Sequence, residues 1–179
     1  FDDLLVRVHR GDDSRAPRLV AALLDLVRAR HQTFNDTLYQ LEPDLKNAPA
    51  GLRDIAAIRL VRQLAPSAFA ARGRVDGERL EDAEEFLLRV RSMLHVQSGR
   101  DANVLTHELQ EKVARPMGFD ATEPHQQVEA LMSTYFRYAR QVDRALSWSC
   151  GVVRPGDIAD AAGPVTEHLS IAPDGVTFR

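Results

Sequence analysis

The sequence predicts an all-α fold, an antiparallel helical bundle of about five to six helices followed by a small C-terminal β-hairpin. Apolar residues recur at spacings of three and four through most of the chain, which is the period of an amphipathic helix. Glycine and proline fall mainly between these periodic stretches, where they end helices. Strand-like alternation occurs near the end of the chain, around Asp174-Gly175.

The composition fits one domain with its own hydrophobic core. The chain has 179 residues, of which 44% are hydrophobic and 27% are charged. A net charge of −3 and a pI of about 6.1 argue against nucleic-acid binding, which usually needs a basic face. The single cysteine, Cys150, excludes an internal disulfide framework and fits the reducing cytoplasm. No apolar run approaches the roughly 18 residues of a membrane span, so we expect a cytoplasmic protein with no membrane or nucleic-acid partner.

The first half of the chain is predicted to contain three helices. Phe1 to His9 carries one apolar face. The second helix runs from about Ala16 to Phe34, and its two apolar stripes place it in the centre of the bundle. The third runs from Gly51 to about Leu64 and is stopped by Pro66. The stripes of the second helix are Leu19, Leu23 and Leu26, and beside them Val20, Leu24 and Val27.

The second half is predicted to contain two long helices with a shorter one between them. The first long helix spans about Glu78 to Gln97, with Gly99 as its C-cap. Thr106 caps the shorter helix, and Thr122 caps the last long helix, which ends at about Gly151. The long helices carry seams typical of a bundle, Leu80, Ala83, Leu87, Val90 and Leu94 in one and Val128, Leu131, Tyr135, Tyr138 and Val142 in the other.

This pattern divides the chain into two segments. Residues 1–150 form the helical domain, which includes an extended arm over residues 38–50. Residues 151–179 form a linker and a short hairpin that docks on the helices or leads into a further domain. Because the chain begins at Phe1 in the middle of a helical pattern, we interpret it as a fragment of a longer protein.

The stretch from Leu41 to Asp54 differs from the amphipathic helices around it. Pro43 and Pro49 remove backbone donors and favour extended geometry in the residues before them. Gly51 then opens the third helix, where an acidic residue in the first turn suits the positive end of the helix dipole. The stretch gathers three carboxylates and two cations, which are Glu42, Asp44, Asp54, Lys46 and Arg53.

Two interpretations of this arm remain open. In the structural one, Glu42 and Asp54 pair with arginines, and Gly51 permits close packing. In the ligand-facing one, Lys46 and Arg53 contact phosphate, which suits an ammonium point charge and a bidentate guanidinium. A cleft carboxylate then assists a metal ion, the candidates being Glu42, Asp44 and Asp54.

Two other groups of residues have structural explanations. The polar cluster Arg100-Asp101-Ala102-Asn103 lies between two predicted helices. We interpret it as a solvated turn in which Asp101 or Asn103 bonds nearby backbone. The aromatic side chains that follow the last helical seam are interpreted as core, and these are Tyr135, Phe136 and Tyr138.

Several catalytic centres are absent from the sequence. No two of the six histidines have the i, i+4 spacing of a helical zinc site, and no His-Asp dipeptide of a metal-dependent phosphohydrolase occurs. The phosphate-cradling G-x-x-x-x-G-K-[ST] motif is missing as well. A nucleotidyl-transfer centre typically needs an Asp-x-Asp after a Gly-Ser turn, and the sequence contains no Asp-x-Asp. We therefore expect no complete catalytic set and no metal site within this chain.

Three runs of residues together resemble a known family. They are Arg30-His31, then Tyr-Gln-Leu-Glu-Pro-Asp-Leu-Lys at residues 39–46, then Pro-Ala-Gly-Leu-Arg-Asp-Ile at residues 49–55. This order resembles the bacterial PII uridylyltransferase/uridylyl-removing enzyme family, and the similarity covers about Arg30 to Leu146. Further matching residues are Leu94-His95, Arg100, Asn103-Val104-Leu105, Gln110, Met132, Tyr135-Phe136-Arg137 and Arg140. The candidate structural residues of the motif are Pro49, Gly51, Arg100 and Asn103.

The resemblance implies that the chain is the helical domain that follows a nucleotidyltransferase domain, with no turnover of its own. The family transfers UMP from UTP to a tyrosine of PII, a regulator of nitrogen metabolism, and uses magnesium. A separate His-Asp domain removes the UMP, and C-terminal ACT domains sense glutamine. The implied partners are the upstream nucleotidyltransferase domain, a PII-type protein, and UTP or another nucleotide. Magnesium is expected for the parent enzyme and no cofactor for this fragment.

The chain also departs from the family pattern. Ala50 stands where the family has the first of two glycines, and Leu60 stands at an aromatic position. These departures support an alternative function, a non-catalytic helical module for regulation or protein interaction that derives from the same family.

Overall fold

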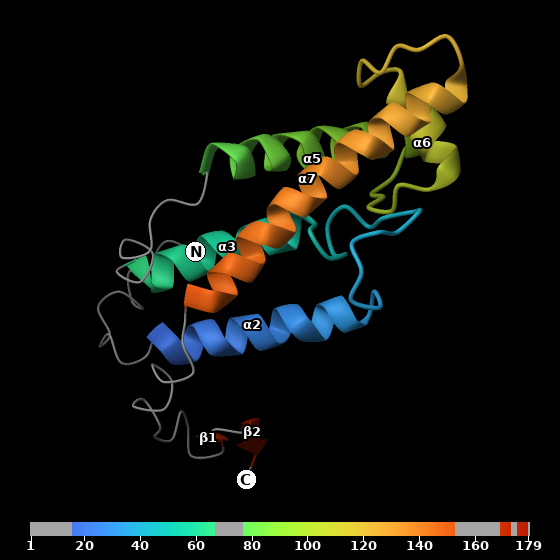
Figure 1. Ribbon diagram of the computed structural model, residues 1–179. Helices are drawn as coiled ribbons and strands as arrows, with labels where there is room; N and C mark the ends of the chain where they lie inside the picture. Colours follow the sequence, from blue (N-terminus) through green and yellow to red (C-terminus); the bar gives the residue numbers. More distant parts are fainter. Residues whose placement is uncertain (1–15, 67–76, 153–168, 173–174, 179) are drawn as a thin grey trace.

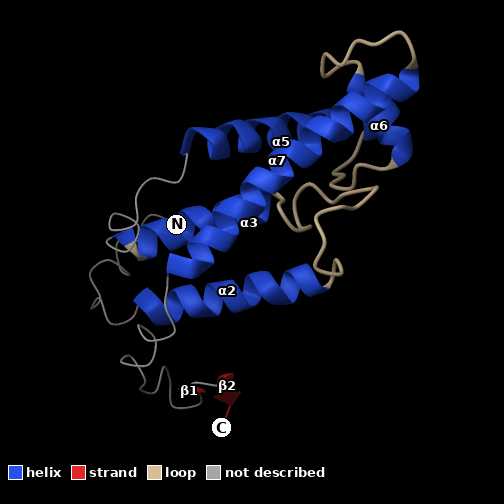
Figure 2. Ribbon diagram, viewed as in Figure 1, coloured by secondary structure: helices blue, strands red, loops and turns tan. Residues whose placement is uncertain are grey.

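The computed structural model describes residues 16–66 and 77–152, together with two strands near the C-terminus. The described chain contains five helices, which confirms the helical class (Figure 2). None of the described helices is both long and apolar enough to cross a membrane. The predicted helix at residues 1–9, most of the loop at 67–77 and the linker at 153–168 lie outside the described residues. The helices are α2 (Ala16–Gln32), α3 (Leu52–Leu64), α5 (Gly77–Ser98), α6 (His107–Ala114) and α7 (Pro124–Val152).

Local signals predict most of the helix ends. After α2, Asn35 and Asp36 take φ values of +56° and +51°, a left-handed conformation that Asn and Asp tolerate. Gly99 follows α5 with a φ of +65°, as expected for a glycine after a helix. The Thr106 side chain accepts a hydrogen bond from the third residue of α6. Thr122 is predicted to cap α7, but the helix begins at Pro124, so Glu123 holds the position directly before it. The predicted start of α7 is therefore off by one residue.

The long helix α7 crosses the molecule and packs against α3, α5 and α6 (Figure 1). Its predicted seam supplies Leu131, Tyr135 and Val142 to the core, while Tyr138 is only partly buried. Every residue of the predicted α5 seam is buried. The two seams therefore meet in one continuous core, as their spacing predicts.

The prediction that α2 is central is wrong. The helix lies at the edge of the bundle, where it packs beside α3 (Figure 1). Its stripe of Val20, Leu24 and Val27 is buried, but Leu19 is 41% exposed and Leu26 is 70% exposed. The two stripes are equally apolar in sequence, but the stripe of Val20, Leu24 and Val27 is the buried one, and of the other stripe only Leu23 packs against the described core.

The arm between α2 and α3 is less extended than predicted. Between Asp44 and Gly51 the backbone forms turns, with hydrogen bonds from Ala48 N to Asp44 O (3.1 Å) and from Gly51 N to Ala48 O (3.0 Å). One short antiparallel bridge, Asp44 with Val104, joins the arm to the segment before α6. The prolines therefore limit the backbone of the arm but do not straighten it, because the turns have hydrogen bonds of their own.

Two strands, β1 (Leu169–Ala172) and β2 (Gly175–Phe178), pair antiparallel near the C-terminus, with Leu169 opposite Phe178. The turn at residues 173–174 lies outside the described residues. How this pair relates to the helical domain stays a prediction.

We predict that Gly51→Ala lowers the free energy of unfolding by about 3 kcal/mol, at the upper end of the over-packing range. The backbone φ of Gly51 is −81°, which alanine adopts freely. The added Cβ, however, would lie 2.9 Å from both Ala48 O and Leu45 O, two backbone atoms that cannot move away cheaply. Urea-induced unfolding measures the effect.

The matched control is Gly99→Ala. A Cβ there meets nothing within 4 Å, so only the positive φ is penalised, by about 1 kcal/mol. Equal losses for the two variants would show that the close packing at Gly51 is unimportant.

Candidate functional site

The arm is held at one buried carboxylate, that of Asp54 in the first turn of α3. Its side chain has an exposure of 0%. Arg30 Nη2 donates to Oδ1 at 2.5 Å, and the backbone N–H of Ala50 donates to Oδ2 at 2.6 Å. His31 Nε2 lies 3.0 Å and 2.9 Å from the two oxygens. Three groups from two segments thus converge on one charge, which confirms the predicted pairing of Asp54 with an arginine.

Arg30 and His31 stand in the last turn of α2 and were not among the predicted site residues. Arg30 also donates from Nη1 to the backbone oxygen of Asn47, at 2.9 Å, so it joins α2 to both the arm and α3. The only signal for these two residues in the sequence is their place at the start of the family signature. Their partner, Asp54, follows more than twenty residues later.

The other two candidate carboxylates also bond within the protein. Asp44 Oδ1 accepts from the backbone N–H groups of Lys46 (2.9 Å) and Asn47 (2.8 Å), which is an Asx-type turn. Glu42 Oε1 accepts from the backbone N–H of His107 at 2.8 Å, at the start of α6. Glu42 pairs with no arginine among the described residues, contrary to the prediction. Its carboxylate instead satisfies a free donor at a helix N-terminus.

The backbone beside Asp54 carries a local strain. Ala50 has a φ of +64°, a left-handed conformation that costs a non-glycine residue about 1 kcal/mol or more. A glycine at this position would adopt the same conformation without that cost. Ala50 and Pro49 are both buried, and the N–H of Ala50 points to the Asp54 carboxylate. The buried hydrogen bond offsets part of the strain.

Tyr135 of α7 is buried close to the arm. Burial raises the pKa of its phenol well above the ordinary value, and the negative charges of Asp44 and Asp54 raise it further. Its hydroxyl has no hydrogen-bond partner among the described residues. The phenol therefore stays neutral at all ordinary pH values, which fits the predicted role of Tyr135 in the core.

The structure does not bring the two candidate cations into one pocket. Lys46 is partly buried and Arg53 is exposed, and neither side chain has a hydrogen bond or ion pair with the described part of the chain. Their backbones are adjacent, with Arg53 N donating to Lys46 O at 3.1 Å. Only Arg53 lines the groove between α2 and α3.

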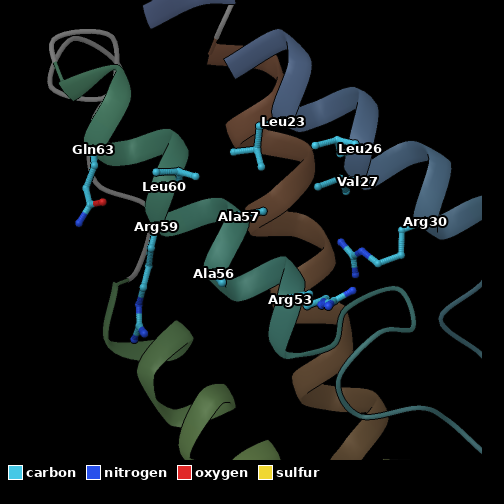
Figure 3. Close-up of a pocket in the computed structure, with 10 residues that line it drawn as sticks. All are labelled: Leu23, Leu26, Val27, Arg30, Arg53, Ala56, Ala57, Arg59, Leu60 and Gln63. Atoms are coloured by element: carbon cyan, nitrogen blue, oxygen red, sulfur yellow. The ribbon is translucent and has the colours of Figure 1, made fainter. Parts of the chain in front are cut away.

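This α2–α3 groove has a volume of about 630 Å³. Figure 3 shows apolar side chains from the two helices facing one another, with the guanidinium groups of Arg30 and Arg53 at one end. Arg59 also lines the groove but pairs with Glu84 of α5 through both of its terminal nitrogens. The apolar lining consists of Leu23, Leu26, Val27, Ala56, Ala57 and Leu60.

The second polar cluster differs from the prediction. Asn103 Oδ1 accepts from Arg91 Nε at 2.8 Å, and Asp101 Oδ1 lies 3.0 Å from His95 Nε2. These partners are side chains of α5, whereas nearby backbone was expected. The backbone oxygen of Asn103 accepts from Leu45 N at 2.8 Å, so this turn also supports the arm, while Arg100 is exposed.

Among the described residues, no group of three or more His, Cys, Asp or Glu side chains is arranged to hold a metal ion. The carboxylates of the arm do not form such a group, because each is directed to a different hydrogen-bond donor.

Comparison with known proteins gives a family match and several relatives. A family model described as GlnD PII-uridylyltransferase matches residues 18–148. The chain is 34% identical over 150 residues to a bifunctional uridylyltransferase/uridylyl-removing enzyme of Burkholderia orbicola (strain MC0-3), covering 79% of this chain and 17% of the relative. It is 38% identical over 128 residues to the enzyme of that name from Psychrobacter sp. (strain PRwf-1), covering 64% and 14%. The Azotobacter vinelandii enzyme is 31% identical over 159 residues, covering 82% and 18%.

The chain thus spans less than a fifth of the length of these relatives. No solved structure matches the chain.

We predict that Asp54→Asn lowers the free energy of unfolding by about 3–5 kcal/mol, the usual effect of removing one partner from a buried ion pair. Arg30, whose side chain is only 14% exposed, would keep its charge without a counter-charge. Urea-induced unfolding at neutral pH measures the loss.

Asp25→Asn is the matched control, because the exposed Asp25–Arg28 pair contributes about 0.5 kcal/mol or less. A loss below about 1 kcal/mol for Asp54→Asn would contradict the central role of this carboxylate.

Proposed function

Because the chain belongs to the GlnD PII-uridylyltransferase family, we propose that it is the helical domain that follows the nucleotidyltransferase domain of a uridylyltransferase. The parent protein transfers UMP from UTP to a PII-type regulator in nitrogen signalling, in the cytoplasm. This domain, residues 1–150, contributes no complete catalytic set, and residues 151–179 lead into the next domain. The match over residues 18–148 carries the proposal.

The arm, in this proposal, is a rigid connector rather than a set of metal ligands. The supporting observation is the buried Asp54 carboxylate, which joins α2, the arm and α3 through Arg30, His31 and the N–H of Ala50. Glu42 and Asp44 are likewise occupied by backbone donors. These contacts favour the structural interpretation of the carboxylates, so we assign the magnesium of the parent enzyme to its catalytic domain.

Lys46 is the cation of the arm that we assign to the phosphates of the nucleotide. Its ammonium has no partner among the described residues, and the turn held by Asp44 fixes its backbone. Arg53, the other candidate, lines the largely apolar α2–α3 groove, which Lys46 does not. A free lysine on a fixed turn is suited to meet an anion as a point charge.

We predict that Lys46→Ala in the longer parent protein raises KM for UTP about tenfold, because one charge-assisted contact of about 1.5 kcal/mol is lost. The measurement is UMP transfer to a PII-type protein at varied UTP concentration. Lys112→Ala is the matched control, since Lys112 forms an exposed pair with Glu108 on α6. Arg53→Ala should leave KM for UTP unchanged.

An unchanged KM for Lys46→Ala would make the whole arm structural. A parent chain without a Gly-Ser…Asp-x-Asp segment upstream of this domain would contradict the catalytic assignment itself.

The alternative is a non-catalytic regulatory or protein-interaction module. The observation that favours it is Leu60, which lines the apolar α2–α3 groove and stands where the resemblance to the family leads us to expect an aromatic residue. Binding of a PII-type protein by a parent chain that shows no UMP transfer would support this alternative.

A further inference from the structure

Two rows of side chains, one on each helix, form the α2–α3 groove. On α2 the row includes Leu23 and Leu26, and Leu26 is 70% exposed. On α3 it includes Ala56 and Leu60, which are spaced as on one face of a helix (Figure 3). Because Ala56 is small and exposed, it leaves room between the larger leucines. An open apolar groove of this kind indicates a surface that packs against another segment.

The groove has the length of about two turns of helix. Its lining runs from Leu23 to Arg30 on α2 and from Arg53 to Gln63 on α3. At the rise of an α-helix these stretches are about 10 Å and about 15 Å long. A helix that lies on two packed helices inserts its side chains between theirs. The occupant that fits is therefore an amphipathic helix whose apolar residues recur at spacings of three and four.

The charges of the groove specify this helix further. Among the described residues, no carboxylate lines the groove, and two of its three arginines are already paired, Arg30 with Asp54 and Arg59 with Glu84. Arg53 is the arginine of the lining that has no partner in the described part of the chain, and Figure 3 shows it at one end of the groove. Charge complementarity therefore favours a carboxylate on the docked helix at the Arg53 end.

The described part of this chain does not supply such a helix. The remaining helices α5, α6 and α7 pack against one another and α3, and none of them lines the groove. The chain spans less than a fifth of the length of its relatives. Under the proposed function, most of the parent protein therefore lies outside this chain, and the helix can come from there.

We propose that the α2–α3 groove is a docking site for an acidic amphipathic helix of the parent protein outside this chain. The apolar residues of that helix lie on Leu23, Leu26 and Leu60, and its carboxylate pairs with Arg53. The groove thereby holds the helical domain against another part of the parent. This proposal rests on the proposed function only in taking the chain to be one domain of a longer protein.

The test compares the accessibility of position 26 in this chain and in the parent, with Cys150→Ala in both. Leu26→Cys reacts with a maleimide, and mass spectrometry of the peptide that contains residue 26 gives the rate, so other thiols of the parent do not interfere. In this chain alone, the rate should match that of Leu88→Cys, an exposed site of α5. In the parent the rate at position 26 should be about tenfold lower, because the docked helix covers the side chain.

A charge placed in the groove should remove this protection. In the parent, Ala56→Glu should return position 26 to the rate seen in this chain, because docking would bury the new charge. Ala56 is exposed, so the substitution leaves the core of the domain intact. The matched control is Ser92→Glu, which replaces a small exposed residue of α5 outside the groove and should change nothing.

Substitutions at Arg53 test the carboxylate. In the parent, Arg53→Glu should speed the reaction at position 26 about threefold, because an attraction becomes a repulsion. Arg53→Lys should keep the slow rate, since it retains the positive charge. An unchanged rate for Arg53→Glu would overturn the assignment of an acidic residue to the docked helix.

Three results would overturn the docking itself. Equal rates at position 26 in this chain and in the parent would show that nothing covers the groove. A slow rate in this chain alone would show that its own residues cover it. Protection that survives Ala56→Glu would show that the covering segment does not enter the groove. None of these rates depends on UMP transfer, so an inactive parent would contradict the proposed function and leave this test intact.

Discussion

The buried carboxylate of Asp54 is the interaction on which the rest of the structure depends. Removing a carboxylate from water costs several kcal/mol unless it is paired and hydrogen-bonded. Here Arg30, His31 and the N–H of Ala50 supply these contacts within 3.0 Å. Because they come from the end of α2 and from the arm, neither segment can move away from α3 without exposing an unpaired charge. The pairing thus makes three consecutive segments one unit.

The arm is fastened at its other end to the region around α6. The buried side chain of Gln110 donates to Leu41 O at 2.7 Å and to Leu105 O at 3.0 Å, and Glu42 meets the N-terminus of α6. Leu105 N donates in turn to Pro43 O at 2.9 Å. The polar residues that make this stretch unusual in sequence are therefore largely engaged in holding its shape. Lys46 and Arg53 are the charged side chains that this framework leaves without a partner among the described residues.

These two charges lie on surfaces of different character. Arg53 borders an apolar groove at the edge of the bundle, whereas Lys46 sits on a turn of the arm and does not line that groove. A cation beside apolar side chains is suited to a peptide segment with an acidic residue, and a cation on a rigid polar turn is suited to a small anion. The same short stretch therefore carries two cations in different surroundings, one beside an apolar groove and one on a polar turn.

The sequence by itself determined the helical class, the bounds of the described helices to within about two residues, and most of the seams of α5 and α7. It could do so because caps, prolines, glycines and apolar spacing act within a few residues of the structure they produce. Only the tertiary structure decided which stripe of α2 is buried, because two equally apolar stripes differ only in whether a neighbour covers them. It also decided that the arm turns, that Glu42 caps α6, and that Asp54 meets Arg30 and His31. These contacts join residues that are far apart in the chain, where spacing along the sequence carries no information about distance.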